Sequence, residues 1–191
     1  VEKTVDPNED RKTITDATDQ SKSPTPTEIE SPPLPRSISQ PPNTQFFENS
    51  KLELKGDLAK NYRGFSLYYP NEWSKNTTDT NFVDVSRKAE SGTPIEQFLV
   101  SYYDSKGTFS GDLERFPKLV EDSNKILGKK LPNYHFISES EKTVNNGWRA
   151  YEMKFEGEGE TQKGEKIKMW GRRLFIPAAR PGVKSGFVIT M

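Results

Sequence analysis

The 191-residue chain offers few side chains that could carry out a reaction. It contains no cysteine, which excludes thiol catalysis, disulfide bonds and cysteine-ligated metal centres. His135 is the single histidine, so a zinc site made of several histidines from one chain is also excluded. A serine–histidine–aspartate triad around His135 is formally possible, but a lone histidine is more often an ordinary surface or strand residue. We therefore predict a protein that is not an enzyme and uses no cofactor.

An acidic run, EGEGETQKGE at 156–165, is the first candidate for a cation site. Calcium loops space their oxygen ligands around a sharp glycine turn, and this run lacks that arrangement. Its glutamates alternate with other residues, which is typical of the solvent-facing side of a hairpin strand. The run also fails as a phosphate loop, because no Lys-Ser/Thr pair follows it. Whether a metal binds stays open from the sequence.

Basic side chains surround a tryptophan in the next stretch, KGEKIKMWGRR at 163–173. Such a set could hold phosphates or an acidic partner. The alternative is an ordinary charged strand face shared by its lysines and its tryptophan. The candidate partner surface consists of Lys166, Lys168, Trp170, Arg172 and Arg173. Four more basic residues could join it, although the sequence does not place them together: Arg63, Lys75, Arg87 and Lys88.

The charge balance argues against a nucleic-acid partner. Residues 1–50 carry five basic and nine acidic side chains, a net charge of −4, whereas residues 51–191 carry 23 and 19, a net charge of +4. A protein that binds nucleic acid through its phosphates needs a strong basic excess. We therefore expect a partner other than DNA or RNA.

The first part of the chain differs in composition from the rest. Seven of the fourteen prolines lie between Pro24 and Pro42, and no aromatic residue precedes Phe46. Such a segment buries too little apolar area to offset its chain entropy. We predict a disordered, extended linker over residues 1–45 and a folded domain over 46–191. The tetrapeptide PPLP in the linker also fits a ligand of a polyproline-binding domain, which is the alternative to a plain spacer.

The linker suits a tethered protein. The chain starts with valine, and we expect that a signal peptide, lipobox or transmembrane segment originally preceded it. No window of the sequence itself approaches the roughly 18 apolar residues that a membrane-spanning helix needs. The predicted membrane tether is therefore a missing N-terminal anchor.

Apolar alternation predicts a sheet interrupted by one helix. GFSLYYP at 64–70 reads as a strand, and Trp73 is expected to fold over its end. The other predicted strands are 81–88, 95–104, 134–144, 148–159, 167–177 and 183–191, with a tight hairpin at 145–147. The predicted structural core includes Phe65, Leu67, Tyr69, Trp73, Trp148, Tyr151 and Phe155. Short connections favour antiparallel pairing, so we predict an α+β fold, a central antiparallel sheet with a helix packed on it.

The helix is predicted from a stripe of apolar residues between 113 and 127. Ser110 or Asp112 can cap its beginning, and Gly128 is a plausible end. Pro117 leaves two possibilities: it conflicts with a helix that starts near 113, or it lies in the first turn of a helix that runs to Gly128.

Several short motifs resemble those of the PsbP-like family over roughly residues 60–191. Gly64, Phe65, Pro70 and Trp73 match the family's opening segment, and Asn146, Gly147, Ala150 and Tyr151 match a later hairpin strand. TPIEQFLVSYYD with the helix after it, and RRLFIP with SGFVIT, resemble the middle portion and the last two central strands. The resemblance implies an α/β/α sandwich. The family's terminal helix has no counterpart after SGFVIT, so we expect the domain to be truncated at its C-terminus.

The resemblance also implies a role. Family members are extrinsic lumenal proteins of photosystem II and bacterial relatives, often lipoproteins, and a Ran-binding nuclear-transport factor shares the fold. Some members bind metal through histidines, and no such site is transferred to a chain whose only histidine is His135. We expect an extracytoplasmic, membrane-tethered accessory module in the periplasm, at the cell surface or in the thylakoid lumen. Its expected partner is a membrane protein complex, which in a photosynthetic host would be photosystem II or its assembly machinery. The alternative is a sensory or adhesive ectodomain of a larger membrane-anchored protein such as a receptor kinase.

Overall fold

The computed structural model describes residues 39–76, 78–144, 147–180 and 182–191. Residues 1–38 of the predicted disordered linker lie outside the described residues. Residues 39–191 form one unit, and its first strand starts at Thr44, two positions before the predicted domain boundary. The predicted turn at Asn145-Asn146 also lies outside the described part of the chain.

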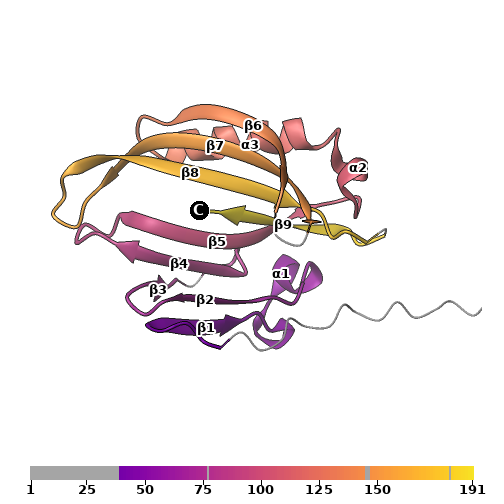
Figure 1. The fold of residues 1–191 in the computed structure, drawn as a ribbon, viewed down its shortest axis with the longest axis horizontal. Coiled ribbons are helices and arrows are strands. Elements are labelled where there is room, and N and C mark those ends of the chain that lie inside the picture. The colour runs from indigo at the N-terminus through magenta and orange to yellow at the C-terminus, as the bar shows by residue number, and fades with distance from the viewer. Residues whose placement is uncertain (1–38, 77, 145–146, 181) are drawn as a thin grey trace, which may run out of the picture. The chain divides into compact units, whose positions relative to one another are not determined.

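All strand pairs among the described residues are antiparallel, and they form two sheets (Figure 1). The small sheet pairs β1 (Thr44–Glu48) with β2 (Ser66–Pro70). The large sheet has seven strands in the order β3-β4-β5-β9-β8-β7-β6. Their bounds are β3 Ser74–Lys75, β4 Val83–Lys88, β5 Pro94–Asp104, β6 His135–Thr143, β7 Arg149–Glu160, β8 Lys166–Ile176 and β9 Ser185–Thr190. The predicted central antiparallel sheet is thus confirmed, and the fold is mostly β.

The strand predicted first does not belong to that central sheet. Within the described part of the chain β2 pairs only with β1, from Thr44 opposite Pro70 to Glu48 opposite Ser66. β1 was missed because its sequence, TQFFE, is short and shows no apolar alternation; of its two phenylalanines, Phe46 is exposed and Phe47 half-buried. This pairing holds residues 66–70 in the small sheet, where Tyr69 is buried and Leu67 and Tyr68 are half-buried.

The main helix is α3 (Phe116–Lys130). Pro117 lies in its first turn, where a missing N–H costs nothing, so the position that the second sequence possibility gave this proline is confirmed. A separate single turn, α2 (Phe109–Asp112), precedes it, and its N-cap is Thr108, whose hydroxyl accepts a hydrogen bond from the N–H of Gly111. The prediction that Gly128 ends the helix was wrong, because α3 continues for two more residues. Two short elements were missed, η1 (Lys51–Glu53) and α1 (Gly56–Lys60).

Different elements cover the two faces of the large sheet. On one face, Phe116 and Val120 of α3 pack against Met153, Phe155 and Phe175 of the central strands. On the other face, the small sheet packs over β4, β5 and β9 through half-buried and buried side chains of β2. The described residues thus form a helix layer, a large sheet and a small sheet. The expected second helical layer of an α/β/α sandwich is not among them.

The predicted core residues divide between these two faces. Phe65, Leu67, Tyr69 and Trp73 lie in the cluster under the small sheet, whereas Tyr151 and Phe155 lie under α3. Trp148 must be corrected, since its side chain is 51% exposed. It stands just before β7, where its carbonyl accepts a hydrogen bond from the N–H of Val144 at 2.8 Å and closes the β6–β7 connection. Its backbone therefore has the structural role, and its ring lies outside the core.

Candidate interaction surface

Packing explains the alternation in the acidic run. Gly157 and Gly159 of β7 face the α3 side of the sheet, where bulky side chains cover them. A Cβ atom at Gly157 would lie 2.4 Å from Cγ of Leu131, and one at Gly159 would lie 2.0 Å from Sδ of Met169. Glycine is thus needed at these alternate positions, and the glutamates between them point to the opposite face.

Lysines of β8 pair with these glutamates. Nζ of Lys168 lies 2.7 Å from a carboxylate oxygen of Glu156, and Nζ of Lys166 lies 3.6 Å from one of Glu158. Among the residues that the structure describes, no three histidine, cysteine, aspartate or glutamate side chains could hold a metal ion together. The geometry therefore favours the interpretation of this run as a charged strand face.

A buried carboxylate lies further along the same face. Glu152 is only 3% exposed, although the sequence pattern gave no sign of this. Nζ of Lys154 lies 3.6 Å from one of its oxygens, and Nη1 of Arg172 lies 3.7 Å from the other. Two cations therefore face one carboxylate, so this part of the face has an excess of positive charge.

Trp170 stands in the middle of this face and is 74% exposed. It lies on β8 directly opposite Glu156 of β7, and period-two alternation places Lys168 and Arg172 on the same side of the strand. Lys166 follows on that side, so four of the five predicted partner-surface residues share one face. We call Lys166, Lys168, Trp170 and Arg172 the Trp170 face.

Arg173 has to be removed from the predicted surface. As the neighbour of Arg172 in a strand, it points to the opposite side of the sheet, towards α3. There Nε donates a hydrogen bond to the hydroxyl of Thr190 at 2.9 Å, and Nη1 donates one to the hydroxyl of Ser123 at 3.0 Å. Burial lowers the pKa of Arg173. This side chain joins α3 to the sheet and is not available to a partner.

The four other basic residues do not join the Trp170 face. Arg63 donates a hydrogen bond to a backbone carbonyl of β9, and Lys75 lies over the ring of Phe47 at 5.4 Å. Arg87 and Lys88 lie on β4, on the far side of β5 and β9 from β8. Sequence reasoning could not separate these groups, because their positions depend on strand order.

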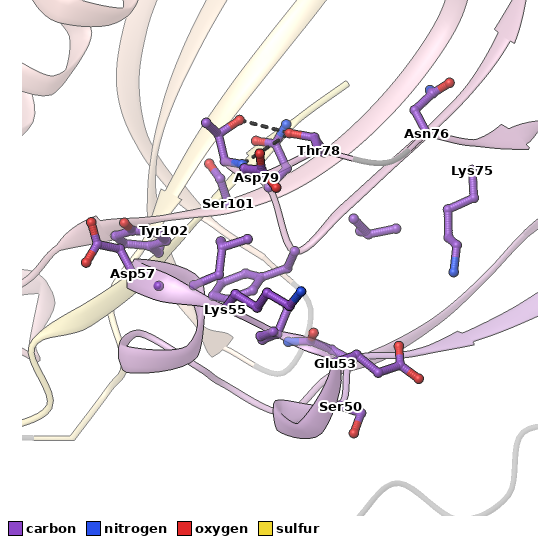
Figure 2. Close-up of a pocket in the computed structure, with 18 of the residues that line it drawn as sticks. Ser50, Glu53, Lys55, Asp57, Lys75, Asn76, Thr78, Asp79, Ser101 and Tyr102 are labelled. Atoms are coloured by element: carbon purple, nitrogen blue, oxygen red, sulfur yellow. Dashed lines mark hydrogen bonds between the residues drawn. The ribbon is translucent and has the colours of Figure 1, made fainter.

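A cleft of about 860 Å³ opens between the segment after β1 and the ends of β4 and β5 (Figure 2). Apolar side chains line part of it, namely Phe47, Leu54, Leu58, Phe82 and Val83. Polar and charged side chains of both signs line the rest, among them Lys55, Lys75, Asn76, Asp79 and Tyr102. Its size fits a small-molecule site. The sequence could not reveal it, because the lining comes from several separate segments.

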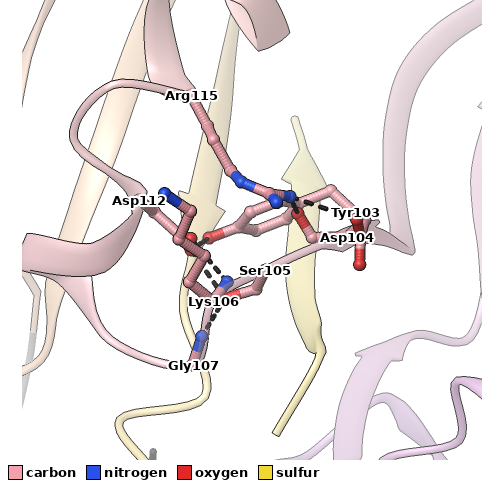
Figure 3. Close-up of polar contacts among 7 residues, drawn as sticks. All are labelled: Tyr103, Asp104, Ser105, Lys106, Gly107, Asp112 and Arg115. Atoms are coloured by element: carbon pink, nitrogen blue, oxygen red, sulfur yellow. Dashed lines mark hydrogen bonds and ion pairs between the residues drawn. The ribbon is translucent and has the colours of Figure 1, made fainter. Parts of the chain in front are cut away.

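A buried carboxylate network lies at the end of β5 (Figure 3). Asp112 has no exposed surface, and its carboxylate accepts hydrogen bonds from the hydroxyls of Tyr103 and Ser105 and from the N–H of Lys106. Burial, followed by the hydrogen bond to Asp112, raises the pKa of Tyr103. The three donors, the hydroxyls of Tyr103 and Ser105 and the N–H of Lys106, all bond to Asp112. This geometry favours a role in holding the loop between β5 and α2.

His135 lies exposed at the beginning of β6, opposite Glu156 of β7. Its side chain forms no hydrogen bond with any other described residue, and neither the cleft nor the network includes it. No helix within residues 39–191, as far as they are described, is long and apolar enough to cross a membrane. The chain matches no family model, and a search of curated proteins finds no match.

Proposed function

We propose that the protein is a non-enzymatic binding module that acts at a membrane protein complex on the extracytoplasmic side of a membrane. The observation that carries this proposal is the Trp170 face, where a largely exposed tryptophan stands beside Arg172 on an uncovered part of the large sheet. Tryptophan and arginine are the residues that most often dominate the binding energy of protein interfaces.

The charges around Trp170 favour a protein partner over a polyanion. Lys166 and Lys168 already pair with glutamates of β7, so they add little net attraction for phosphates. Arg172 is more available, because its nearest carboxylate is 3.7 Å away and is shared with Lys154. We therefore expect Trp170 and Arg172 to anchor the partner, with the paired lysines at the rim.

The resemblance to PsbP-like domains supplies the membrane context. The motif residues Phe65 and Trp73 pack in the cluster under the small sheet, so the opening signature marks a structural element. A helix on one face of an antiparallel sheet agrees with the expected layering, whereas the small sheet on the other face differs from an α/β/α sandwich. By this analogy the complex in a photosynthetic host would be photosystem II or its assembly machinery. The ectodomain of a receptor kinase remains the alternative, and a kinase encoded upstream of residue 1 would favour it.

Co-purification tests the proposal. The full-length protein is expressed in its native host with an affinity tag, and membranes are solubilised in mild detergent. We expect a defined set of membrane subunits to co-purify with the tagged protein. Recovery of the tagged protein without any membrane subunit would contradict the proposal.

A further inference from the structure

The cleft between the segment after β1 and the ends of β4 and β5 has an apolar floor (Figure 2). Leu58, Phe82 and Val83 form this floor, and all three are buried in the cluster under the small sheet. Half-buried Leu54 and Tyr102 stand beside it, and the ring centroids of Tyr102 and Phe82 lie 5.9 Å apart. The floor is therefore part of the folded core and offers apolar surface to a ligand.

Two separate segments of the chain form the walls of the cleft. The first wall comprises η1 and α1, and the side-chain amide of buried Asn49 anchors its beginning by donating a hydrogen bond to the carbonyl of Arg63 at 2.9 Å. The second wall follows β3, where the side-chain amide of Asn76 donates hydrogen bonds to Asp84 at 3.1 Å and to Ser86 at 2.9 Å. Side-chain hydrogen bonds thus fix both walls to the rest of the domain.

Each wall also carries one lysine and one carboxylate that form no ion pair within the described part of the chain. These four charged residues are Glu53 and Lys55 in the first wall, and Lys75 and Asp79 in the second. The ammonium of Lys75 lies over the ring of Phe47 instead. A third carboxylate of the lining, that of Asp57, is already paired with Lys60 at 2.8 Å. Charges of both signs therefore stand beside the apolar floor without neutralising one another directly.

We propose that the cleft binds a small zwitterionic molecule with an apolar body, of the kind represented by a dipeptide with two apolar side chains and free ends. The apolar body lies on the floor, the ligand carboxylate faces the two lysines, and the ligand ammonium faces Glu53 and Asp79. The cleft volume of about 860 Å³ lies in the range of small-molecule sites. This site is separate from the Trp170 face, because β5 and β9 lie between β4 and β8 in the sheet.

The charge pattern decides between classes of ligand. A purely apolar molecule would desolvate the four charged side chains without pairing them, which costs free energy. A polyanion would meet the carboxylates of Glu53 and Asp79 as well as the two lysines, and like charges repel. A polycation would meet the lysines with the same result. A ligand that carries one charge of each sign pairs with both kinds of group.

Calorimetric titration of the whole chain with three related dipeptides tests the charge requirement. The free dipeptide phenylalanyl-phenylalanine carries both charges, its N-acetyl form carries only the carboxylate, and its C-terminal amide carries only the ammonium. We expect the free dipeptide to bind and each blocked form to bind at least about tenfold more weakly, because one charged contact is lost.

Paired substitutions assign the two contacts. Lys55→Gln combined with Lys75→Gln removes the groups that face the ligand carboxylate, so amidation of the dipeptide should no longer weaken its binding. Glu53→Gln combined with Asp79→Asn should in the same way abolish the effect of N-acetylation. Lys51→Gln is the control, because this exposed lysine of η1 lies outside the cleft lining and its loss should leave both effects unchanged.

Three results would overturn the inference: equal binding of the three dipeptides, binding of none of them, or an effect of amidation that persists in the double lysine variant. All four substituted side chains are exposed, so we expect thermal unfolding of the variants to match that of the unmodified protein. The outcome is independent of the proposed function, because co-purification with membrane subunits tests the Trp170 face and not the cleft.

Discussion

The hydroxyl of Tyr103 donates a hydrogen bond of 2.7 Å to the carboxylate of Asp112, and both side chains are buried. This contact joins the end of β5 to α2 across a loop of four residues. The other oxygen of Asp112 accepts the N–H of Lys106 at 2.7 Å, so the carboxylate also fixes the backbone of the loop. These hydrogen bonds link the large sheet to the helix layer, and we expect them to contribute much of the stability at this end of the domain.

Asp112→Ala should destabilise the fold strongly. The substitution leaves the buried hydroxyls of Tyr103 and Ser105 and the part-buried N–H of Lys106 without this acceptor, at a cost of about 3 kcal/mol in the free energy of unfolding. Asp104→Ala is the matched control, because this carboxylate is largely exposed and pairs with Arg115 at 3.1 Å; its loss should cost less than about 1 kcal/mol. Urea denaturation followed by tryptophan fluorescence measures both values. Similar losses for the two variants would show that the buried network contributes no special stability.

The stability should also decline in alkaline solution. Burial raises the pKa of Tyr103 above its ordinary value of 10.0, so the folded protein keeps the phenolic proton after the unfolded chain has lost it. The free energy of unfolding should therefore be at its full value below pH 10 and fall as the pH rises beyond it. Tyr103→Phe should reduce this decline, while Tyr134 and Tyr151, whose pKa values are also raised by burial, retain part of it. A profile from pH 8 to 11 that is identical in the variant would contradict the assignment to Tyr103.

Gly107 should tolerate no side chain. Its φ is +91°, and a Cβ atom would lie 2.3 Å from the carbonyl oxygen of Arg180 and 3.0 Å from that of Val183. Gly107→Ala should cost more than about 2 kcal/mol, because backbone strain and a backbone clash add together. Gly92 has a similar φ of +86° but open space around it, so Gly92→Ala should cost only about 1 kcal/mol. Thermal unfolding of both variants separates the two contributions, and an equal shift would refute the clash.

Adjacent arginines on β8 should respond in opposite ways. Arg173→Ala removes a half-buried side chain that bonds to Ser123 and Thr190, so we expect a loss of about 2 kcal/mol in stability. Arg172→Ala should change stability by less than about 1 kcal/mol but weaken partner recovery from membranes. Chemical denaturation and co-purification on the same two variants provide the check. A stable Arg173→Ala protein with reduced partner binding would return this residue to the interaction surface.

The elements that follow β2 show what sequence patterns can establish. Apolar and polar residues alternate over the long segment that contains Tyr151 and Phe155. This pattern predicts the strand β7, and both side chains lie under α3. Pro117 marked one of two possible starts for the helix, and it lies in the first turn of α3. Long periodic segments with clear boundaries were therefore predictable.

Features that depend on strand order could not be predicted from the sequence. Residue type alone suggested that Trp148 lies in the core and Arg173 on the partner surface. In the structure Trp148 is exposed, whereas Arg173 points towards α3 and bonds to Ser123. Glu152 is buried beside Ala150 of its own strand and Leu174 of β8, a neighbour that only the pairing of β7 with β8 reveals. β1 carries too short a pattern to be detected, and its pairing with β2 decides that residues 66–70 join the small sheet.

Partner recovery by two tryptophan variants tests the central claim most directly. Trp170 and Trp148 are both exposed, at 74% and 51%, and replacing either by alanine should leave the core intact. Each variant is tagged and purified from native membranes beside the unmodified protein, and the co-purifying subunits are quantified. We expect Trp170→Ala to reduce their recovery at least about tenfold, as for an interface anchor, and Trp148→Ala to leave it unchanged. Equal recovery with Trp170→Ala and the unmodified protein would contradict the proposal that the Trp170 face binds the partner.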